Sequence, residues 1–207
     1  MTQSRDTAVL LAVDCGTQSL RTLLFSQNGD LLGRVQVEYA PYVSPTPGWA
    51  EQDPEIYWNS LCAACNLLKA EHPEHVKRIA GVGVTSQRAS MINVDTAGKP
   101  LRPAIIWLDQ RKADPPFAPR HVVKLALQAV GMYHTVLDIQ AEGKCNWIRQ
   151  HQPDIWAATA KYLQVSGFLN HRLTGRFADS VASQIGHLPF NYKKMRWTKK
   201  PDLPALF

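Results

Sequence analysis

The stretch that decides the fold is residues 8–19, which read AVLLAVDCGTQS. Its first six residues are a continuous apolar run, too short for a helix of ordinary length and typical of a buried strand. The run leads into Asp14 and then into a polar turn that contains Gly16. A buried strand that ends in an acid and a glycine-containing turn is suited to holding phosphate, because glycine lets backbone N–H groups approach the oxygens closely.

Two further strands are predicted directly after this turn, at residues 20–26 and 31–38. Asn28 and Gly29 lie between them and predict a type I′ hairpin turn, in which both central residues have positive φ. Three consecutive strands joined by tight turns are therefore expected to open the domain.

The rest of the chain alternates predicted helices and strands. Asp53-Pro54-Glu55 has the residue types of a helix start, and apolar residues then recur at helical spacing. A buried strand follows at residues 76–85, then a hairpin formed by residues 91–94 and 104–107. Four helices are predicted after it, at residues 122–130, 139–150, 154–163 and 166–173, the last capped by Gly175. This order predicts an α/β fold with a mixed sheet.

Composition favours a soluble cytoplasmic protein. Of the 207 residues, 45% are hydrophobic and 19% charged, and no apolar run approaches the roughly 20 residues of a membrane helix. No secretory signal is visible at residues 1–6. The net charge of +6 includes a basic cluster at residues 193–200, which we interpret as a solvated segment because no nucleic-acid motif accompanies it. Cys62 and Cys65 have metal-pair spacing but lie in a helical pattern, which favours core packing.

The turn after the first strand carries the residues that phosphate binding requires. Asp14 is suited to orient Mg²⁺ through water, since that ion keeps several waters and binds one or two carboxylates. The sequence is not a Walker loop, which needs a Lys-Ser/Thr pair before a helix. The candidate phosphate-binding residues are Gly16, Thr17, Gln18, Ser19 and Arg21.

Residues 14–21, followed by the Asn28-Gly29 turn, resemble the first phosphate motif of the FGGY carbohydrate kinases, which belong to the actin and hexokinase superfamily. The resemblance continues, in order and at family spacing, through residues 47–54, 81–88, 98–101, 107–111, 144–147, 172–175 and 179–180. It implies a ribonuclease-H-like (actin-like ATPase) domain. It also implies ATP-dependent phosphorylation of a sugar or polyol, with Mg²⁺ bound alongside ATP.

The resemblance also implies where the acceptor binds. Gln87 and Arg88 follow the predicted strand at its carboxyl end, where open α/β sheets present ligands. Trp107 would offer an apolar face to the carbon chain, and Asp109 would accept hydrogen bonds from hydroxyls. An alternative stays open, in which Trp107 belongs to the core and Asp109 with Arg111 only braces the loop.

Two departures from the family pattern bear on the substrate. Glycerol kinases have Glu where this chain has Ala89, and Tyr where it has Ile139. Loss of two hydrogen-bonding partners disfavours a small triol, so we expect a longer polyol or a ketose. The Gln-Met-His of xylulokinases is absent near Gln87 as well, which leaves the identity of the acceptor open.

By the same resemblance, residues 1–207 are expected to be an N-terminal kinase lobe that is incomplete. The family's general base is an Asp beyond the position of Asp179-Ser180, and the one later acid, Asp202, lies in a Leu-Pro linker. The second lobe, with its adenine site, is not matched either, so the chain alone is expected to be inactive. Two other classes stay open: a non-catalytic sugar-binding or regulatory module, and an actin-like ATPase. A homo-oligomer is compatible with the sequence, whereas nucleic acid and membrane are not expected partners.

Overall fold

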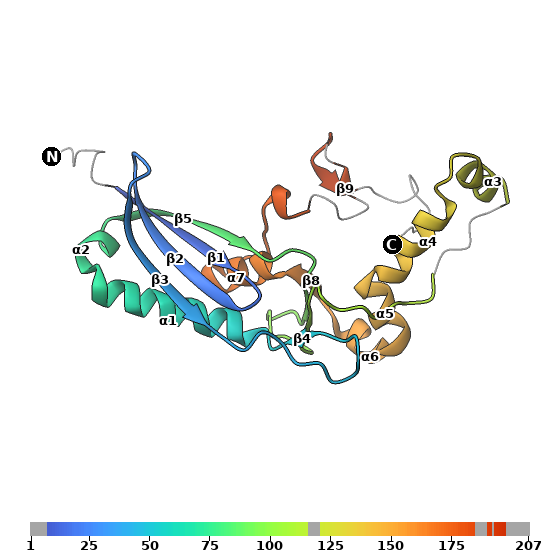
Figure 1. The fold of residues 1–207 in the computed structure, drawn as a ribbon, viewed down its shortest axis with the longest axis horizontal. Coiled ribbons are helices and arrows are strands. Elements are labelled where there is room, and N and C mark those ends of the chain that lie inside the picture. The colour runs from blue at the N-terminus through green and yellow to red at the C-terminus, as the bar shows by residue number, and fades with distance from the viewer. Residues whose placement is uncertain (1–7, 116–120, 185–189, 192, 198–207) are drawn as a thin grey trace.

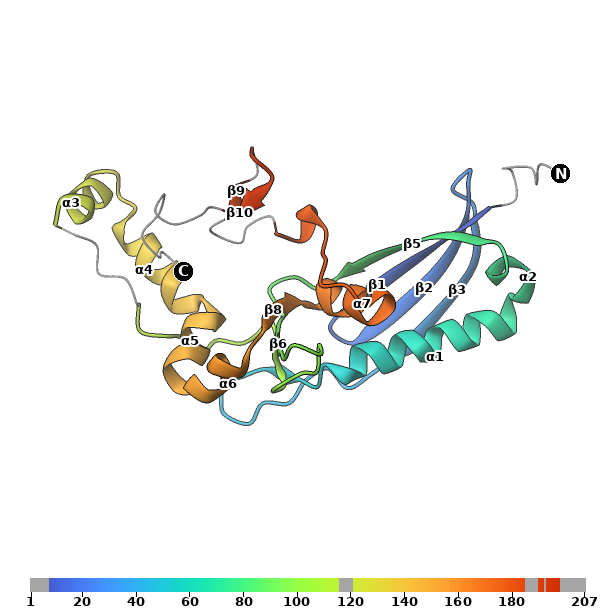
Figure 2. The ribbon, with the colours of Figure 1, turned by 180° about the vertical axis from the view of Figure 1, so that it is seen from behind.

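A computed structural model describes residues 8–115, 121–184, 190–191 and 193–197 of the chain. A four-stranded sheet lies at one end of the molecule, and helices α3 to α6 lie at the other (Figures 1 and 2). Residues 1–6, Asp202 and the last two lysines of the basic cluster lie outside the described residues, so the predictions made for them are not addressed by the structure.

The first sheet has the strand order β3 (Leu31–Glu38), β2 (Ser19–Ser26), β1 (Val9–Cys15) and β5 (Ile79–Ser86). The pairs β1–β2 and β2–β3 are antiparallel, whereas β1 and β5 are parallel. The prediction of a mixed sheet opened by three consecutive strands is therefore confirmed.

The turn between β2 and β3 differs from the predicted type I′ turn. Gly29 has a φ of +89°, but Asn28 is not among the described residues with positive φ. The Gly29 amide donates to the Ser26 carbonyl and the Ser26 amide donates to the Asp30 carbonyl, which is the pattern of a three-residue hairpin loop with one left-handed glycine. The Ser26 hydroxyl accepts from the amides of Asn28 and Asp30, and this side chain holds the longer loop.

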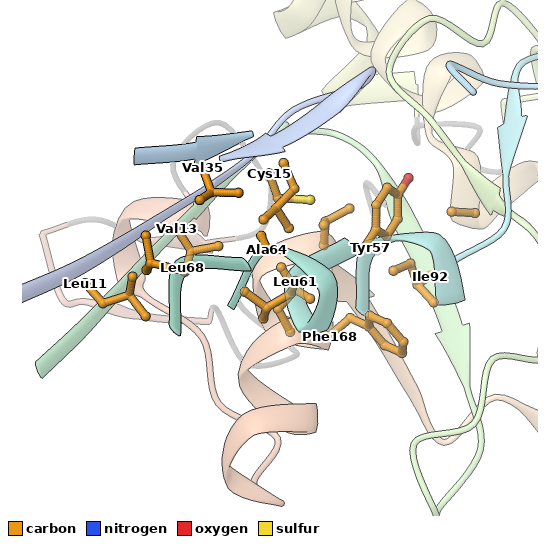
Figure 3. Packing of buried hydrophobic residues seen from close by; sticks show 14 of the residues in the cluster. Leu11, Val13, Cys15, Val35, Tyr57, Leu61, Ala64, Leu68, Ile92 and Phe168 are labelled. Carbon is orange, nitrogen blue, oxygen red and sulfur yellow. The ribbon is translucent and has the colours of Figure 1, made fainter. Parts of the chain in front are cut away.

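Helix α1 (Glu55–Glu71) packs its apolar side against the first sheet, as Figure 3 shows. The helix begins at Glu55, one residue after the predicted first helical residue Pro54, and Asp53 Oδ1 accepts a hydrogen bond from the Glu55 amide at 3.0 Å. Cys65 packs against the same core, in agreement with the core interpretation. The buried residues that α1 contributes are Tyr57, Ser60, Leu61, Ala64 and Leu68.

A second sheet lies between the first sheet and the helical end of the molecule (Figure 2). Its antiparallel order is β4 (Glu51–Gln52), β7 (Ala104–Ile105), β6 (Met91–Val94) and β8 (Lys161–Gln164). The predicted helix over residues 154–163 is wrong in its second half, because α6 (Pro153–Ala158) ends and the chain continues as β8. Pairing with all four residues of β6 overrides the local helical pattern.

The helices that follow agree with the sequence except at one break. The structure has α3 (His121–Ala129), α4 (Tyr133–Glu142) and α5 (Lys144–His151), so Gly143 divides the single helix predicted over residues 139–150. Gly143 has an extended ψ of 105°, which interrupts the helical backbone. Helix α7 (Val165–Thr174) ends at left-handed Gly175, as predicted. The shorter elements are α2 (Pro73–Val76), η2 (Val181–Gln184), β9 (Phe190–Asn191) and β10 (Arg196–Trp197).

None of the helices in the described part of the chain is long and apolar enough to cross a membrane. Within the same residues, His, Cys, Asp and Glu side chains do not gather in groups of three or more that could hold a metal ion.

Thr22 offers a test of the core beneath the first sheet. Its side chain is completely buried, its strand neighbours are Val13 and Val35, and within the described residues its Oγ1 has no hydrogen-bond partner. An unsatisfied buried hydroxyl costs free energy, so Thr22→Val should raise the free energy of unfolding by about 1 kcal/mol. Urea denaturation followed by circular dichroism measures the change. Thr46→Val, in an exposed loop, is the control and should be neutral; a destabilised Thr22→Val would contradict the argument.

Candidate functional site

The residues at positions 14–19, called the phosphate turn from here on, connect β1 to β2. The Gly16 amide donates to the Ser19 carbonyl at 2.9 Å, and the Tyr39 hydroxyl donates to the carbonyls of Gly16 and Ser19, which ties the turn to the end of β3. A Cβ at Gly16 would meet nothing nearer than the Ser19 carbonyl oxygen, at 3.4 Å. A side chain at position 16 would therefore not clash with the rest of the chain. Because Gly16 has no side chain, a ligand can approach its backbone closely.

Asp14 and Arg21 face each other across β1 and β2. Arg21 Nη1 lies 3.2 Å from Asp14 Oδ2, and both side chains are about two-fifths exposed. Arg21 Nε also donates to Gln36 on β3 at 3.1 Å. Because side chains alternate along a strand and Val13 and Cys15 are buried under the sheet, this pair lies on the opposite face, away from α1. One half-exposed carboxylate beside a cation fits Mg²⁺ that arrives with phosphate oxygens and keeps its waters.

Cys15 lies in the phosphate turn but is not suited to act as a nucleophile. It is completely buried, and its Sγ is 3.7 Å from the Tyr39 hydroxyl. Burial raises the pKa of Cys15 to about 12, so it remains a thiol near neutral pH. Its role at the turn is packing.

Three predicted site residues meet at the Thr17 hydroxyl. Thr17 Oγ1 donates to Gln87 Oε1 at 3.0 Å and accepts from Trp107 Nε1 at 3.0 Å. These contacts join residues 70 and 90 positions apart in the sequence. The structure thus brings the phosphate turn together with two of the predicted acceptor residues.

Gln52 and Tyr57 complete this arrangement, and the sequence analysis did not identify them as site residues. Gln52 Nε2 donates to the Thr17 carbonyl at 2.8 Å, and the Tyr57 hydroxyl donates to Gln52 Oε1 at 2.6 Å. Gln87 Nε2 donates to Gln52 Oε1 at 3.3 Å and to the Tyr57 hydroxyl at 3.1 Å. Gln52 belongs to residues 47–54, one of the segments that resemble the family, so the sequence did indicate this region. Only the structure shows that the Gln52 side chain contacts Thr17.

Asp109 forms the centre of a buried ion-pair cluster. Arg111 Nη2 lies 2.6 Å from Asp109 Oδ2 and 2.9 Å from Glu51 Oε1, and Arg102 also pairs with Glu51. Asp109 Oδ2 further accepts from the Ala50 amide at 2.8 Å. The side chains of Asp109 and Arg111 are 0% and 1% exposed, respectively. The Arg111 guanidinium stacks 3.9 Å from the centre of the Trp49 ring, which adds a cation–π contact.

This geometry matches the bracing alternative for Asp109 and Arg111. Both Asp109 oxygens accept hydrogen bonds within the chain, so contact between this carboxylate and an acceptor stays a prediction. Burial by itself raises the pKa of Asp109, but hydrogen bonds from the Arg111 side chain and from the Ala50 and Arg111 amides leave the pKa below its ordinary value.

A cleft of about 790 Å³ opens beside this cluster. We call it the Trp107 cleft. Trp107 is 53% exposed there, so it is not a core residue. Asp109 also borders the cleft, while Lys144 Nζ donates to the Asp109 carbonyl at 2.6 Å. Burial lowers the pKa of Lys144 despite the nearby carboxylate of Asp109. Ala89 and Ile139 line the cleft together with Trp107.

Arg88 and Gln18 are both exposed. Arg88 is exposed, in the connection between β5 and β6, and is not among the residues that line the Trp107 cleft. Its neighbour Ala89 does line the cleft and has a φ of +54°, which is unusual for a residue with a side chain. Gln18 is exposed at the tip of the phosphate turn. Binding roles for Arg88 and Gln18 therefore stay predictions.

The comparison with known families decides what kind of protein this is. Residues 9–201 match the model of the FGGY family of carbohydrate kinases, N-terminal domain. The chain belongs to this family. The resemblance seen in the sequence is thereby confirmed, and so is the predicted actin-like ATPase class of fold.

Relatives of this FGGY-family chain include proteins named as glycerol kinases and as xylulose kinases. It is 32% identical to a glycerol kinase of Janthinobacterium sp. (strain Marseille), over 96% of the chain and 40% of that protein. It is 25% identical to a xylulose kinase of Escherichia coli (strain K12), over 95% of the chain and 42% of that protein. The chain thus spans about two-fifths of the length of these relatives.

Solved structures agree on the fold. The Plasmodium falciparum glycerol kinase with ADP superposes with a TM-score of 0.73 at 22% identity, covering 94% of this chain and 40% of that one. A xylulose kinase from Brucella ovis gives 0.67 at 27% identity, covering 81% and 34%. The chain therefore shares the fold of these kinases.

The Asp109–Arg111 pair provides a test of the cluster that supports the cleft. Asp109→Asn leaves Arg111 short of its counter-charge and should lower the free energy of unfolding at pH 7 by about 3 kcal/mol. The folded-state pKa of Asp109 is below its ordinary value of 3.8, so the stability it contributes is fully present above that value and is lost as pH falls through the lowered pKa.

The stability difference between wild type and Asp109→Asn should therefore be constant from pH 7 to about pH 5 and shrink below pH 4. Urea denaturation across that range measures it. Asp138→Asn, at an exposed position on α4, is the control and should change stability little. A difference that grows on acidification would contradict the assignment.

Proposed function

We propose that the protein carrying this chain transfers the γ-phosphoryl group of Mg·ATP to a hydroxyl of a sugar or polyol. The observation that carries the proposal is the hydrogen bond between Thr17 Oγ1 and Trp107 Nε1, because it brings the phosphate turn and the Trp107 cleft into direct contact. Phosphoryl transfer depends mainly on holding donor and acceptor in line at close range. Membership of a carbohydrate-kinase family supports the same reaction class.

Each candidate residue then has a defined task. Gly16, Thr17, Gln18, Ser19 and Arg21 would bind the phosphates, and Asp14 would hold Mg²⁺ through water. When bound, this ion neutralises charge that develops on the phosphate oxygens. Trp107 would support the carbon chain of the acceptor, while Gln87 and Arg88 would bind its hydroxyls. Asp109, with its carboxylate fully buried, would serve mainly to position the loop that carries Trp107.

Removal of the acceptor proton requires a general base. In the family that the chain resembles, this base is an Asp, and none of these 207 residues corresponds to it. We therefore propose that the chain alone does not turn over substrate. Activity would belong to a protein that includes both the base and the adenine site. We keep cytoplasmic action on small molecules, without nucleic acid or membrane, as part of the proposal.

The acceptor is proposed to be a polyol longer than glycerol or a ketose. Two residues that line the Trp107 cleft, Ala89 and Ile139, replace the polar Glu and Tyr expected of glycerol kinases. A three-carbon triol has few groups with which to compensate for these lost hydrogen bonds. Relatives named as glycerol, xylulose and gluconate kinases match at similar identities, so relatedness alone does not decide the acceptor.

Asp14→Ala tests the role of the phosphate turn. In the protein that carries the complete lobes, this change should lower kcat by about 100-fold or more, because Mg·ATP loses its protein carboxylate. An ADP-release assay with the preferred acceptor measures the effect. Asp30→Ala, in the exposed β2–β3 loop, is the matched control and should keep wild-type activity. Full activity of Asp14→Ala would remove Asp14 from the mechanism.

A panel of glycerol, xylitol, D-xylulose and D-gluconate tests the acceptor class. We expect kcat/KM for xylitol or D-xylulose to exceed that for glycerol by about 10-fold, the effect of one to two absent hydrogen bonds. Ile139→Tyr should narrow this gap by restoring a hydroxyl, whereas Ile139→Phe, which lacks the hydroxyl, should not. Glycerol as the best acceptor of the wild-type protein would overturn the proposed class. Parallel assays of the 207-residue chain should show no turnover.

A further inference from the structure

Part of the wall of the Trp107 cleft is made of side chains without a hydrogen-bond donor. Ala89, Met91 and Ile139 line the cleft, and none of these side chains carries an N–H or O–H group. Ile139 is 38% exposed although it is apolar. Trp107 adds the face of its ring, since its indole N–H already donates to Thr17. Carbon, not a hydroxyl, is the ligand group that suits this apolar wall.

Several polar residues that line the cleft do not present polar side-chain atoms to it. The side chains of Asp109 and Arg111 are 0% and 1% exposed, respectively. Asn146 is 2% exposed, and the Tyr162 hydroxyl is buried, which leaves the half-buried Tyr162 ring at the cleft. The Lys144 ammonium group donates to the Asp109 carbonyl and lies 3.5 Å from Asp109 Oδ1. These polar groups therefore do not change the apolar character of the wall.

Gln110, Lys112 and Glu142 supply accessible hydrogen-bonding groups at the same cleft, and all three are exposed. Lys112 Nζ lies 3.8 Å from Glu142 Oε1, and these two side chains are 59% and 63% exposed. The cleft thus combines exposed polar side chains with an apolar wall. It can bind hydroxyls on one part of a ligand and bare carbon on another.

The positions of Trp107 and Ile139 give such a ligand a direction. Trp107 contacts the phosphate turn through Thr17. Ile139 lies on α4, which is at the opposite end of the molecule from the first sheet (Figure 1). An acceptor that is phosphorylated beside the phosphate turn would therefore extend its remaining carbons toward Ile139.

We propose that the acceptor is a deoxy sugar or a deoxypolyol, whose carbon without a hydroxyl lies against Ile139, an inference that rests on the proposed function. The hydroxyl that is phosphorylated is at the other end of the same molecule. Its oxygen forms a bond to the γ-phosphorus, and ADP leaves with the electron pair of the broken P–O bond. The hydroxyl proton passes to the carboxylate general base of the complete protein.

The size of the preference follows from what each group loses or gains at the wall. A hydroxyl placed there gives up its hydrogen bonds to water and finds no partner, whereas a methyl group gains from leaving water. Hydrophobic sites distinguish a ligand from its hydroxylated analogue by about 10- to 100-fold. Because the Trp107 cleft also has exposed polar side chains, we expect a value near the lower limit.

The experiment compares fully hydroxylated compounds with forms in which one terminal hydroxyl is replaced by hydrogen. The protein that carries the complete lobes is assayed by ADP release with the D and L forms of xylulose, fructose and tagatose, and with both terminal deoxy forms of each. Glycerol is paired with propylene glycol. Every deoxy form keeps one primary hydroxyl for phosphorylation. We expect at least one deoxy form to exceed its parent by about 10-fold in kcat/KM.

Ile139→Thr tests the wall itself, because it introduces a hydroxyl on a β-branched side chain. The deoxy preference of this variant should fall from about 10-fold to about 1-fold, whereas Ile139→Val should keep the preference. Val130→Thr is the matched control. Val130 is 68% exposed, is not among the residues that line the cleft, and should leave both kcat/KM values as in wild type. The preference is a ratio within one enzyme, so a partly unfolded preparation does not alter it.

Three results would overturn the deoxy acceptor and leave the kinase proposal intact. They are parents used at least as well as all of their deoxy forms, turnover confined to xylitol or D-gluconate, and an Ile139→Thr protein with the wild-type preference. Absence of turnover with every compound, xylitol and D-gluconate included, would instead overturn the kinase proposal and the deoxy acceptor together.

Discussion

The buried ion pair of Asp109 and Arg111 is the constraint on which the candidate site depends. Charges removed from water must be paired and hydrogen-bonded, and here Glu51, Arg102 and the Ala50 amide complete the set. Glu51 lies in β4, Ala50 directly precedes it, and Arg102 precedes β7. The contacts of Asp109 and Arg111 with Ala50 and Glu51 therefore join two parts of the chain about 60 residues apart. Trp107 is two residues before Asp109, so the ion pair also anchors the loop that carries Trp107 beside the cleft.

The placement of Trp107 connects this buried cluster to the phosphate turn. Trp107 belongs to the loop that Asp109 braces, and its indole N–H donates to the Thr17 hydroxyl. The same hydroxyl contacts Gln87. Gln52 and Tyr57 hold the turn and Gln87 from below. Buried side chains thus surround the Thr17 hydroxyl, at which the phosphate turn, Gln87 and Trp107 meet.

Several features could be predicted from the sequence because their causes are local. The apolar run before Asp14, the acid and proline at the start of α1, and Gly175 at the end of α7 each gave a correct element, since capping and backbone preference act over a few residues. The errors lie where distant partners decide. Residues 161–163 lie in a predicted helix but pair with β6, and the Ser26 hydroxyl accepts hydrogen bonds within a turn that differs from the one that Asn28-Gly29 predicts.

By itself the sequence determined the family and the order of elements, and it identified the phosphate turn and Trp107 as candidate site residues, because motif spacing and periodicity are properties of the chain. Only the tertiary structure decided what these residues do to one another. It buried the Asp109 carboxylate, left Arg88 outside the cleft, and brought Thr17, Gln87 and Trp107 to one hydroxyl. Hydrogen bonds depend on distances of about 3 Å, and for residues 70 to 90 positions apart only the fold sets such distances.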